Sequence, residues 1–154
     1  MRPYTNHSIG VDIGSNTIRL CRFNLSGTLY LNCQFDIPKP AMPGAVTVAL
    51  CEKIVSIDPN GLADFVGVSF PGEIDLNGRM IKTCIELPGW IDVPLADWLE
   101  SRLFMKVNLF SALECSVAGK NHSLTGIHID HDLLYTLGAA LLDLDRRNSF
   151  IDAR

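Results

Sequence analysis

The sequence contains no long apolar run. The longest, Leu137–Leu142, is well short of the roughly 18 to 20 residues that a membrane-spanning helix needs. The polar stretch Met1–Ser8 also lacks the apolar centre of a secretory signal. From these two absences we expect a cytoplasmic protein with no membrane partner.

Clusters of basic residues are absent as well. The 154-residue chain has 13 Lys and Arg against 17 Asp and Glu, a net charge of −4, and no segment concentrates the basic residues. Nucleic acids are bound largely through their phosphates, by groups of Lys and Arg. We therefore predict no nucleic-acid partner.

The cysteines and histidines lack the spacings of metal sites. No C-x-x-C pair occurs among the five cysteines, which are Cys21, Cys33, Cys51, Cys84 and Cys115. They are far apart in apolar segments, so we predict buried free thiols. His122, His128 and His131 are six and three residues apart, which matches no standard zinc motif. No metal ligand is predicted.

Segments of β and helical character alternate along the chain. With 47% hydrophobic and 19% charged residues, the composition is that of one domain with a core. Three β-prone runs joined by tight turns predict an antiparallel meander: Ser8–Ile13, Ile18–Asn24 and Thr28–Ile37. Apolar residues at helical spacing predict three helices: Pro43–Ile57, Pro94–Phe104 and Ala112–Gly119.

The order of these segments predicts a mixed five-stranded α/β sheet flanked by helices. Its central strands are expected at Ile9–Ile13, Phe65–Phe70 and Val107–Phe110. Four residues are expected in the core: Leu20, Val68, Leu99 and Leu109. A hairpin turn is expected at Leu76-Asn77-Gly78-Arg79. We place Trp90 and Trp98 in the core or at an interface between lobes.

The tip of the first predicted hairpin carries an Asp-x-Gly motif. It reads Asp12-Ile13-Gly14-Ser15-Asn16-Thr17. The glycine lets backbone N–H groups approach phosphate oxygens, and the carboxylate can hold a hydrated magnesium ion. Ordinary β-turns use the same pattern, with the carboxylate accepting N–H bonds inside the turn. The motif alone leaves a phosphate loop and a structural turn as alternatives.

Two further stretches carry a resemblance to a known family. Val66–Asp75, which includes Pro71-Gly72, is followed by Leu87-Pro88-Gly89-Trp90. In this order and spacing the motifs resemble those of the ROK family of sugar kinases and sugar-responsive repressors, over roughly residues 8 to 142. Exopolyphosphatases of the same superfamily begin with a similar Asp-Ile-Gly-Ser-Asn stretch but are not expected to have the two later motifs. They remain an alternative.

The resemblance implies an actin-like ATPase (ribonuclease H-like) fold. Residues 1–120 would form the amino-terminal lobe, and residues 121–154 would resemble the first strands of a second lobe, incomplete at Arg154. ATP and Mg²⁺ would bind, weakly or not at all, at five residues: Asp12, Gly14, Ser15, Asn16 and Thr17. A sugar would bind at three: Gly72, Glu86 and Ser111.

Three positions depart from the family pattern. Ala112 stands where the family has the aspartate that acts as general base, so no catalytic residue is assigned. Glu86 stands where a sugar-binding asparagine is usual, and Gly138-Ala139-Ala140 stands where a second phosphate loop has Gly-Thr-Gly. An alanine cannot accept a proton, and an added Cβ obstructs the approach of backbone to phosphate.

These departures predict a ROK-like domain that does not catalyse phosphoryl transfer as an isolated chain. The alternative is an ATP-dependent hexose kinase completed by another chain. The apolar run Leu133–Leu142 predicts a homodimer or higher oligomer, since an unpaired apolar edge recruits a second chain.

Overall fold

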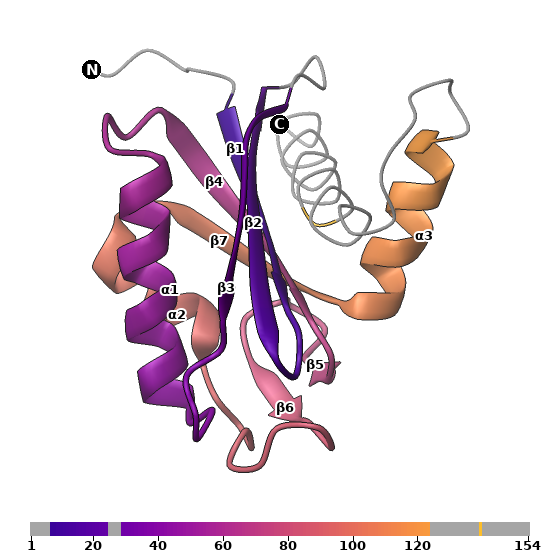
Figure 1. The fold of residues 1–154 in the computed structure, drawn as a ribbon. Helices are drawn as coiled ribbons and strands as arrows, with labels where there is room; N and C mark the ends of the chain where they lie inside the picture. Colours follow the sequence, from indigo (N-terminus) through magenta and orange to yellow (C-terminus); the bar gives the residue numbers. More distant parts are fainter. Residues whose placement is uncertain (1–6, 25–28, 124–138, 140–154) are drawn as a thin grey trace.

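Five strands form one mixed sheet in the order β3-β2-β1-β4-β7 (Figure 1). The structure is a computed structural model that describes residues 7–24, 29–123 and 139. The strands are β1 (His7–Ile13), β2 (Thr17–Asn24), β3 (Leu29–Asp36), β4 (Ala63–Phe70) and β7 (Lys106–Ser111). β1, β2 and β3 are antiparallel neighbours, whereas β4 runs parallel to β1 and β7 parallel to β4. The predicted meander and the mixed α/β sheet are confirmed.

The helices cover both faces of this sheet. α1 (Pro43–Ile57) and α2 (Leu95–Leu103) lie side by side on one face, and α3 (Ala112–Ser123) lies on the other side (Figure 1). α1 has the predicted bounds, and α2 is one residue shorter at each end. The predicted end of α3 at Gly119 is wrong, because one glycine inside a helix costs only about 1 kcal/mol and does not by itself end it.

Asp58 explains how the chain turns from α1 into β4. Its carboxylate accepts hydrogen bonds from the backbone N–H groups of Leu62 and Ala63, both at 2.9 Å. Asp58 is buried, and Arg22 of β2 forms an ion pair with it at 3.4 Å. The helix stop that the sequence indicates is thus a hydrogen-bonded turn that also sets the start of β4.

The main core lies between the sheet and the pair α1 and α2. Alternate strand residues face these helices, as a pleated strand requires. Leu20, Val68, Leu99 and Leu109, the four residues predicted in the core, are at most 1% exposed, so this prediction is confirmed. The opposite face carries a smaller apolar cluster of Phe110, Cys115 and Ala139.

The prediction of buried thiols is wrong for three of the cysteines, and the two tryptophans differ in burial. All five cysteines are free, but only Cys21 and Cys115 are buried; the other three are partly exposed. Trp90 is fully buried, whereas Trp98 is 37% exposed and lines a shallow hollow between α1 and α2. The reason is geometric, because Trp98 sits on the outer side of an amphipathic helix whose inner side holds Leu95 and Leu99.

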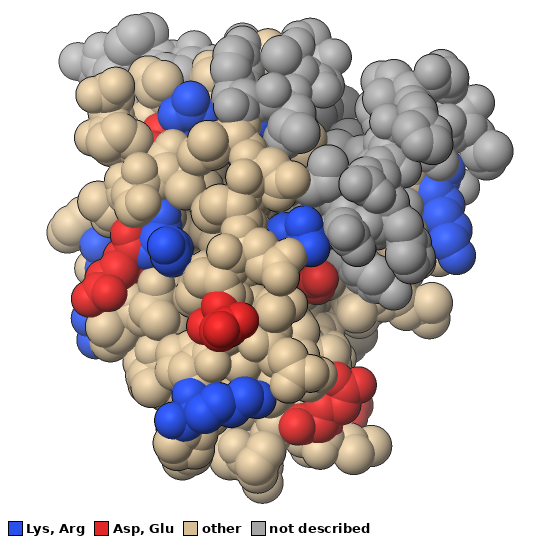
Figure 2. Space-filling model, viewed as in Figure 1, with Lys and Arg blue, Asp and Glu red and all other residues tan. Residues whose placement is uncertain are grey.

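Charges are interspersed over the described surface. Figure 2 shows acidic and basic side chains next to one another on the face that it presents. Among the described residues, no helix is long and apolar enough to cross a membrane. The apolar run Leu133–Leu142 lies outside the described residues, apart from Ala139.

Candidate functional site

The predicted site residues follow strands that end at one edge of the sheet. β1, β4 and β7 are parallel, so their carboxyl ends meet at the same edge. The loop containing Gly14 follows β1, Pro71-Gly72 follows β4, and Ala112 follows β7. Ligands of open α/β sheets bind outside the carboxyl ends of the strands. This edge is therefore the candidate site.

The β1–β2 loop is a tight turn. The backbone N–H of Gly14 donates to the Thr17 carbonyl at 2.9 Å, and a Cβ on Gly14 would lie 3.1 Å from the same oxygen. The Ser15 carbonyl accepts a hydrogen bond from Nζ of Lys39 at 2.9 Å. Gly14 lies between the first two strands as predicted, and the structure adds an ammonium group beside the loop.

Asp12 lies on the sheet face opposite the main core. Its strand neighbours are Arg19 on β2 and Ser69 on β4. Burial raises the pKa of Asp12 above its usual value, while the Ser69 hydroxyl and the Arg19 guanidinium lower it by smaller amounts. The Ser69 hydroxyl is buried and has no hydrogen bond of ordinary geometry among the described residues. The Asp12 carboxylate and the Ser69 hydroxyl are thus neighbours that can form hydrogen bonds to a ligand.

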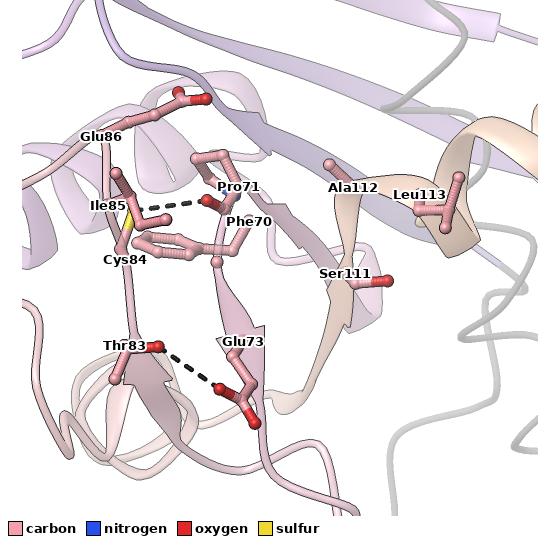
Figure 3. A pocket seen from close by; sticks show the side chains of 11 residues that line it. Phe70, Pro71, Glu73, Thr83, Cys84, Ile85, Glu86, Ser111, Ala112 and Leu113 are labelled. Atoms are coloured by element: carbon pink, nitrogen blue, oxygen red, sulfur yellow. Dashed lines mark hydrogen bonds between the residues drawn. The ribbon is translucent and has the colours of Figure 1, made fainter.

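A pocket opens between the β5–β6 hairpin and the end of β7 (Figure 3). β5 (Glu73–Ile74) and β6 (Ile81–Thr83) form a separate two-stranded sheet, whose turn is at the predicted position. The pocket has a volume of about 450 Å³, which is within the range of small-molecule sites. Its lining includes all four residues that sequence analysis assigned to sugar binding and to the family's catalytic position: Gly72, Glu86, Ser111 and Ala112.

The lining does not include the Asp12–Thr17 loop. The structure therefore brings the predicted sugar-binding positions together and places the predicted phosphate loop separately, at the end of the neighbouring strand. This division resembles two adjacent subsites, one at the hairpin and one at the β1–β2 turn.

Gly72 is required by close packing rather than by an unusual backbone angle. A Cβ at this position would lie 2.5 Å from the Thr83 carbonyl oxygen and 3.2 Å from the side chains of Cys84 and Phe70. Because a backbone oxygen cannot be displaced cheaply, any side chain at residue 72 would push the β4–β5 connection away from Thr83 of β6 and disturb the hairpin.

Ser111 has a structural role in addition to lining the pocket. Its Oγ accepts a hydrogen bond from the backbone N–H of Glu114 at 3.2 Å. Ser111 thereby caps α3, and the segment Ser111-Ala112-Leu113-Glu114 has the pattern of a capping box. The methyl group of Ala112 is the first side chain of the helix and lines the pocket with no proton-accepting group.

Sequence analysis missed three polar lining residues: Glu73, Thr83 and Cys84. Thr83 Oγ1 donates to Glu73 Oε2 at 3.4 Å, and Cys84 Sγ donates to the Pro71 carbonyl at 3.3 Å (Figure 3). Glu73 follows Pro71-Gly72 directly and could have been found from that motif. Thr83 and Cys84 come from an ordinary short strand, so no sequence signal distinguishes them.

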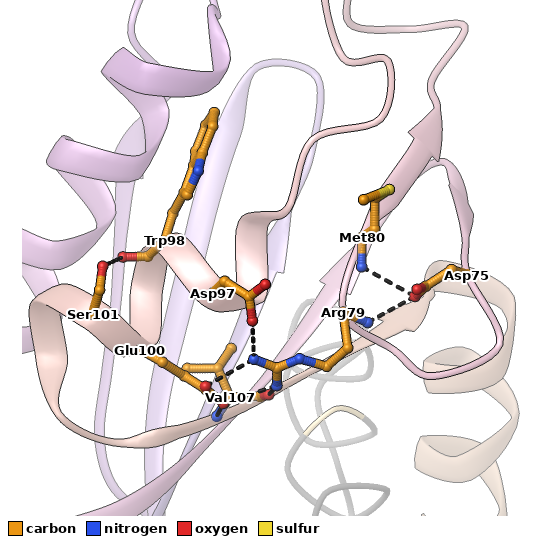
Figure 4. Close-up of polar contacts among 8 residues, drawn as sticks. All are labelled: Asp75, Arg79, Met80, Asp97, Trp98, Glu100, Ser101 and Val107. Atoms are coloured by element: carbon orange, nitrogen blue, oxygen red, sulfur yellow. Dashed lines mark hydrogen bonds and ion pairs between the residues drawn. The ribbon is translucent and has the colours of Figure 1, made fainter.

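The side chain of Arg79 holds the β5–β6 hairpin against β7 (Figure 4). The Arg79 guanidinium donates to both carboxylate oxygens of Glu100 at 2.8 Å and to the Val107 carbonyl at 2.7 Å. It also forms an ion pair with Asp97. Since β5–β6 and β7 form opposite walls of the pocket, these bonds help to set the distance between the walls.

The sheet order, the parallel ends and the Asp-x-Gly turn are those of a lobe of the actin-like ATPase fold. The structure superposes on a ROK family glucokinase from Streptomyces griseus, solved with glucose and AMPPNP, with a TM-score of 0.68 and 21% identity over 74% of this chain and 36% of that chain. A ROK family transcriptional regulator homologous to the E. coli MLC protein has a TM-score of 0.62 and 12% identity, over 77% of this chain and 32% of that chain.

The sequence comparison agrees. A glucokinase of Thermotoga maritima is 28% identical over 133 residues, which are 86% of this chain and 42% of that protein. The resemblance to the ROK family and the sugar-kinase-like fold are confirmed. The chain spans less than half the length of these three relatives. No protein-family model matches it.

Proposed function

We propose that this chain is a ROK-like domain that binds a hexose in the pocket between the β5–β6 hairpin and β7 but does not itself catalyse phosphoryl transfer. The observation that carries the proposal is the pocket lining. Gly72, Glu86 and Ser111 meet there with Ala112, which stands at the position of the family's general base.

The lining suits a sugar chemically. Thr83 and Ser111 supply hydroxyl groups, and the two glutamates supply acceptors for sugar hydroxyls. Pro71, Ile85 and Leu113 supply exposed apolar surface for the C–H groups of a ring, and the buried Phe70 ring backs the pocket. Trp90 supports this surface from behind, with its ring 4.7 Å from that of Phe70 and its Nε1 donating to the Ala41 carbonyl at 2.8 Å.

The β1–β2 loop is proposed to bind the phosphates of ATP with magnesium, through Asp12, Gly14, Ser15, Asn16 and Thr17. Mg²⁺ usually keeps several waters and takes one or two carboxylates plus substrate phosphates. Asp12, with the unpartnered Ser69 hydroxyl beside it, fits a hydrated ion of this kind. The bound ion would neutralise charge on the phosphates, and the Lys39 ammonium would add a second positive charge at the loop.

The alanine at residue 112 supports the noncatalytic proposal. A positioned base contributes about 10²- to 10⁴-fold to the rate of a proton-transfer step. The methyl group of Ala112 cannot take the proton of a sugar hydroxyl. The same fold occurs in a glucokinase solved with glucose and in a transcriptional regulator, so the fold alone does not require that this chain be a kinase.

A coupled assay of ADP release, run with a panel of hexoses, tests this proposal. We expect the purified chain to release ADP no faster than its Asp12→Ala variant. Turnover above background that disappears in Asp12→Ala would contradict the noncatalytic reading and support the alternative, a hexose kinase. Release of phosphate from polyphosphate, without a sugar, would support the exopolyphosphatase alternative.

One observation favours the active alternative enough to keep it. Glu73 and Glu86 both line the pocket, and a carboxylate is a competent proton acceptor. If the chain releases ADP, Glu73→Gln and Glu86→Gln will show which of them replaces the missing aspartate.

A further inference from the structure

Among the described residues, the charged groups that line the pocket are negative. They are the carboxylates of Glu73 and Glu86, and no described Lys, Arg or His belongs to the lining. The ammonium of the neighbouring Lys82 is held by Asp92 at 2.9 Å. A ligand that enters this pocket therefore meets two carboxylates with no lining cation to balance them.

The two glutamates differ in their partners. Glu73 accepts a hydrogen bond from the Thr83 hydroxyl at 3.4 Å. Glu86 is exposed and has no partner among the described residues. Figure 3 shows Glu73 beside Thr83 and Glu86 at the far end of the segment that leaves β6. The carboxylate of Glu86 is thus available to a ligand.

A neutral asparagine and a glutamate recognise different ligands at this place. An amide both donates and accepts hydrogen bonds, and it suits a neutral hydroxyl. An ionised carboxylate only accepts, and its strongest partner is a positively charged donor. Glu86 directly precedes the motif Leu87-Pro88-Gly89-Trp90, in which Leu87 and Trp90 are buried, and a glutamate at this position adds a negative charge to the lining.

We infer that the pocket prefers an amino sugar, a hexose with a protonated amino group, whose ammonium binds the carboxylate of Glu86. This inference rests on the proposed hexose site. Glu73 adds to the negative potential from the opposite end of the wall. The apolar surface of Pro71, Ile85 and Leu113 would contact the ring in the same way for a charged or a neutral sugar, so the preference comes from the charge.

Isothermal titration of the full chain with three sugars tests the inference. The probes are glucosamine, which is charged, and two neutral sugars, glucose and N-acetylglucosamine. We expect glucosamine to bind about threefold to tenfold more tightly than glucose, the size of a charge-assisted contact at an exposed site. Raising the salt concentration is expected to reduce this ratio, because salt screens exposed charges.

Matched variants separate charge from shape. Glu86→Gln keeps the size of the side chain and removes its charge, so the ratio of glucosamine affinity to glucose affinity is expected to fall to about one, whatever the change does to glucose binding itself. Glu52→Gln, an exposed residue of α1 away from the pocket, is expected to keep the preference. Circular dichroism of each variant checks that it is folded.

The results of these titrations distinguish the amino-sugar inference from the proposed hexose site. If glucose binds as tightly as glucosamine, or if Glu86→Gln keeps the preference, the amino-sugar inference is wrong and the hexose site stands. If none of the three sugars binds, both are wrong.

Discussion

At the scale of single residues, the burial of Asp12 is expected to lower the stability of the folded protein. Its carboxylate lies on a partly buried strand where burial is the largest influence on its pKa and raises it. The charged form is therefore disfavoured in the folded protein relative to the unfolded chain. A group in this state lowers stability near neutral pH, which fits a residue kept for a ligand rather than for the fold.

We predict that Asp12→Asn raises the stability of the folded protein at pH 7, by the amount typical of single stabilising changes, about 0.5–2 kcal/mol. Because the folded pKa lies above the unfolded one, the native state binds more protons between the two values, and the stability contributed by this group falls as pH rises through that window. The gain in stability from Asp12→Asn should therefore vanish below pH 3.8, the ordinary pKa of an aspartate.

Urea denaturation at several pH values measures this change. Asp36→Asn, at an exposed carboxylate of β3, is the control and should leave stability unchanged. In thermal melts, Mg-ATP is expected to stabilise the wild type more than Asp12→Asn. Equal stabilisation of both proteins would show that Asp12 does not contribute to nucleotide binding.

At the scale of elements, polar contacts join the β5–β6 hairpin to the rest of the fold, beside the buried Ile81. The backbone N–H of Leu109 donates to the Gly78 carbonyl, and the N–H of Ala96 to the Arg79 carbonyl. The Asp75 carboxylate accepts the N–H groups of Arg79 and Met80 and so closes the turn (Figure 4). Arg79 then joins this turn to α2 and β7 through its side chain.

We predict that Arg79→Ala destabilises the protein by about 1–3 kcal/mol, since Glu100 and the Val107 carbonyl lose a charged donor. Burial alone would raise the pKa of Glu100, but its hydrogen bonds from Arg79 and from the Val107 N–H, with nearby positive charge, make the net pKa lower than usual. The Arg79–Glu100 pair therefore stabilises the fold at pH values above 4.5, the ordinary pKa of a glutamate. This stabilisation is lost as the pH falls through the pKa of Glu100 in the folded protein.

Chemical denaturation at pH 7 and at pH 3 measures this effect. The difference between wild type and Arg79→Ala should be larger at pH 7 than at pH 3. Lys82→Ala removes an exposed ion pair with Asp92, in which the side chains are 46% and 61% exposed, and should cause no measurable change. A loss of stability in Arg79→Ala that is the same at both pH values would contradict the role of the Glu100 charge.

At the scale of the whole molecule, we propose that the chain assembles into a homodimer or higher oligomer. The proposal rests on the sequence of Leu133–Leu142, an apolar run suited to pairing with a second copy. Light scattering at micromolar concentration should give a mass above that of one 16.9 kDa chain. Leu134→Lys should reduce that mass, whereas a monomeric wild type would contradict the proposal. The division at residue 120 also stays a prediction, and α3 continues past it to Ser123.

The sequence by itself determined the order and type of the elements, because these depend on local periodicity and on turn residues. α1 was predicted at its observed bounds, since apolar spacing, a proline at its start and the Asp58 turn are all local signals. The Asp-x-Gly turn and the motifs around Gly72 and Trp90 were likewise readable in order along the chain. The exposure of Trp98 and the length of α3 were not, because packing decides which side of a helix is covered and whether a glycine ends it.

Only the tertiary structure decided which residues share a site. Glu73, Thr83 and Ser111 come from β5, β6 and β7, and they meet because Arg79 and the backbone bonds of Gly78 hold the hairpin against β7. The close approach of the Thr83 carbonyl to Gly72 and the burial that shifts the pKa of Asp12 arise from the same long-range packing. Distances between segments far apart in sequence depend on the whole fold, so no local pattern could have supplied them.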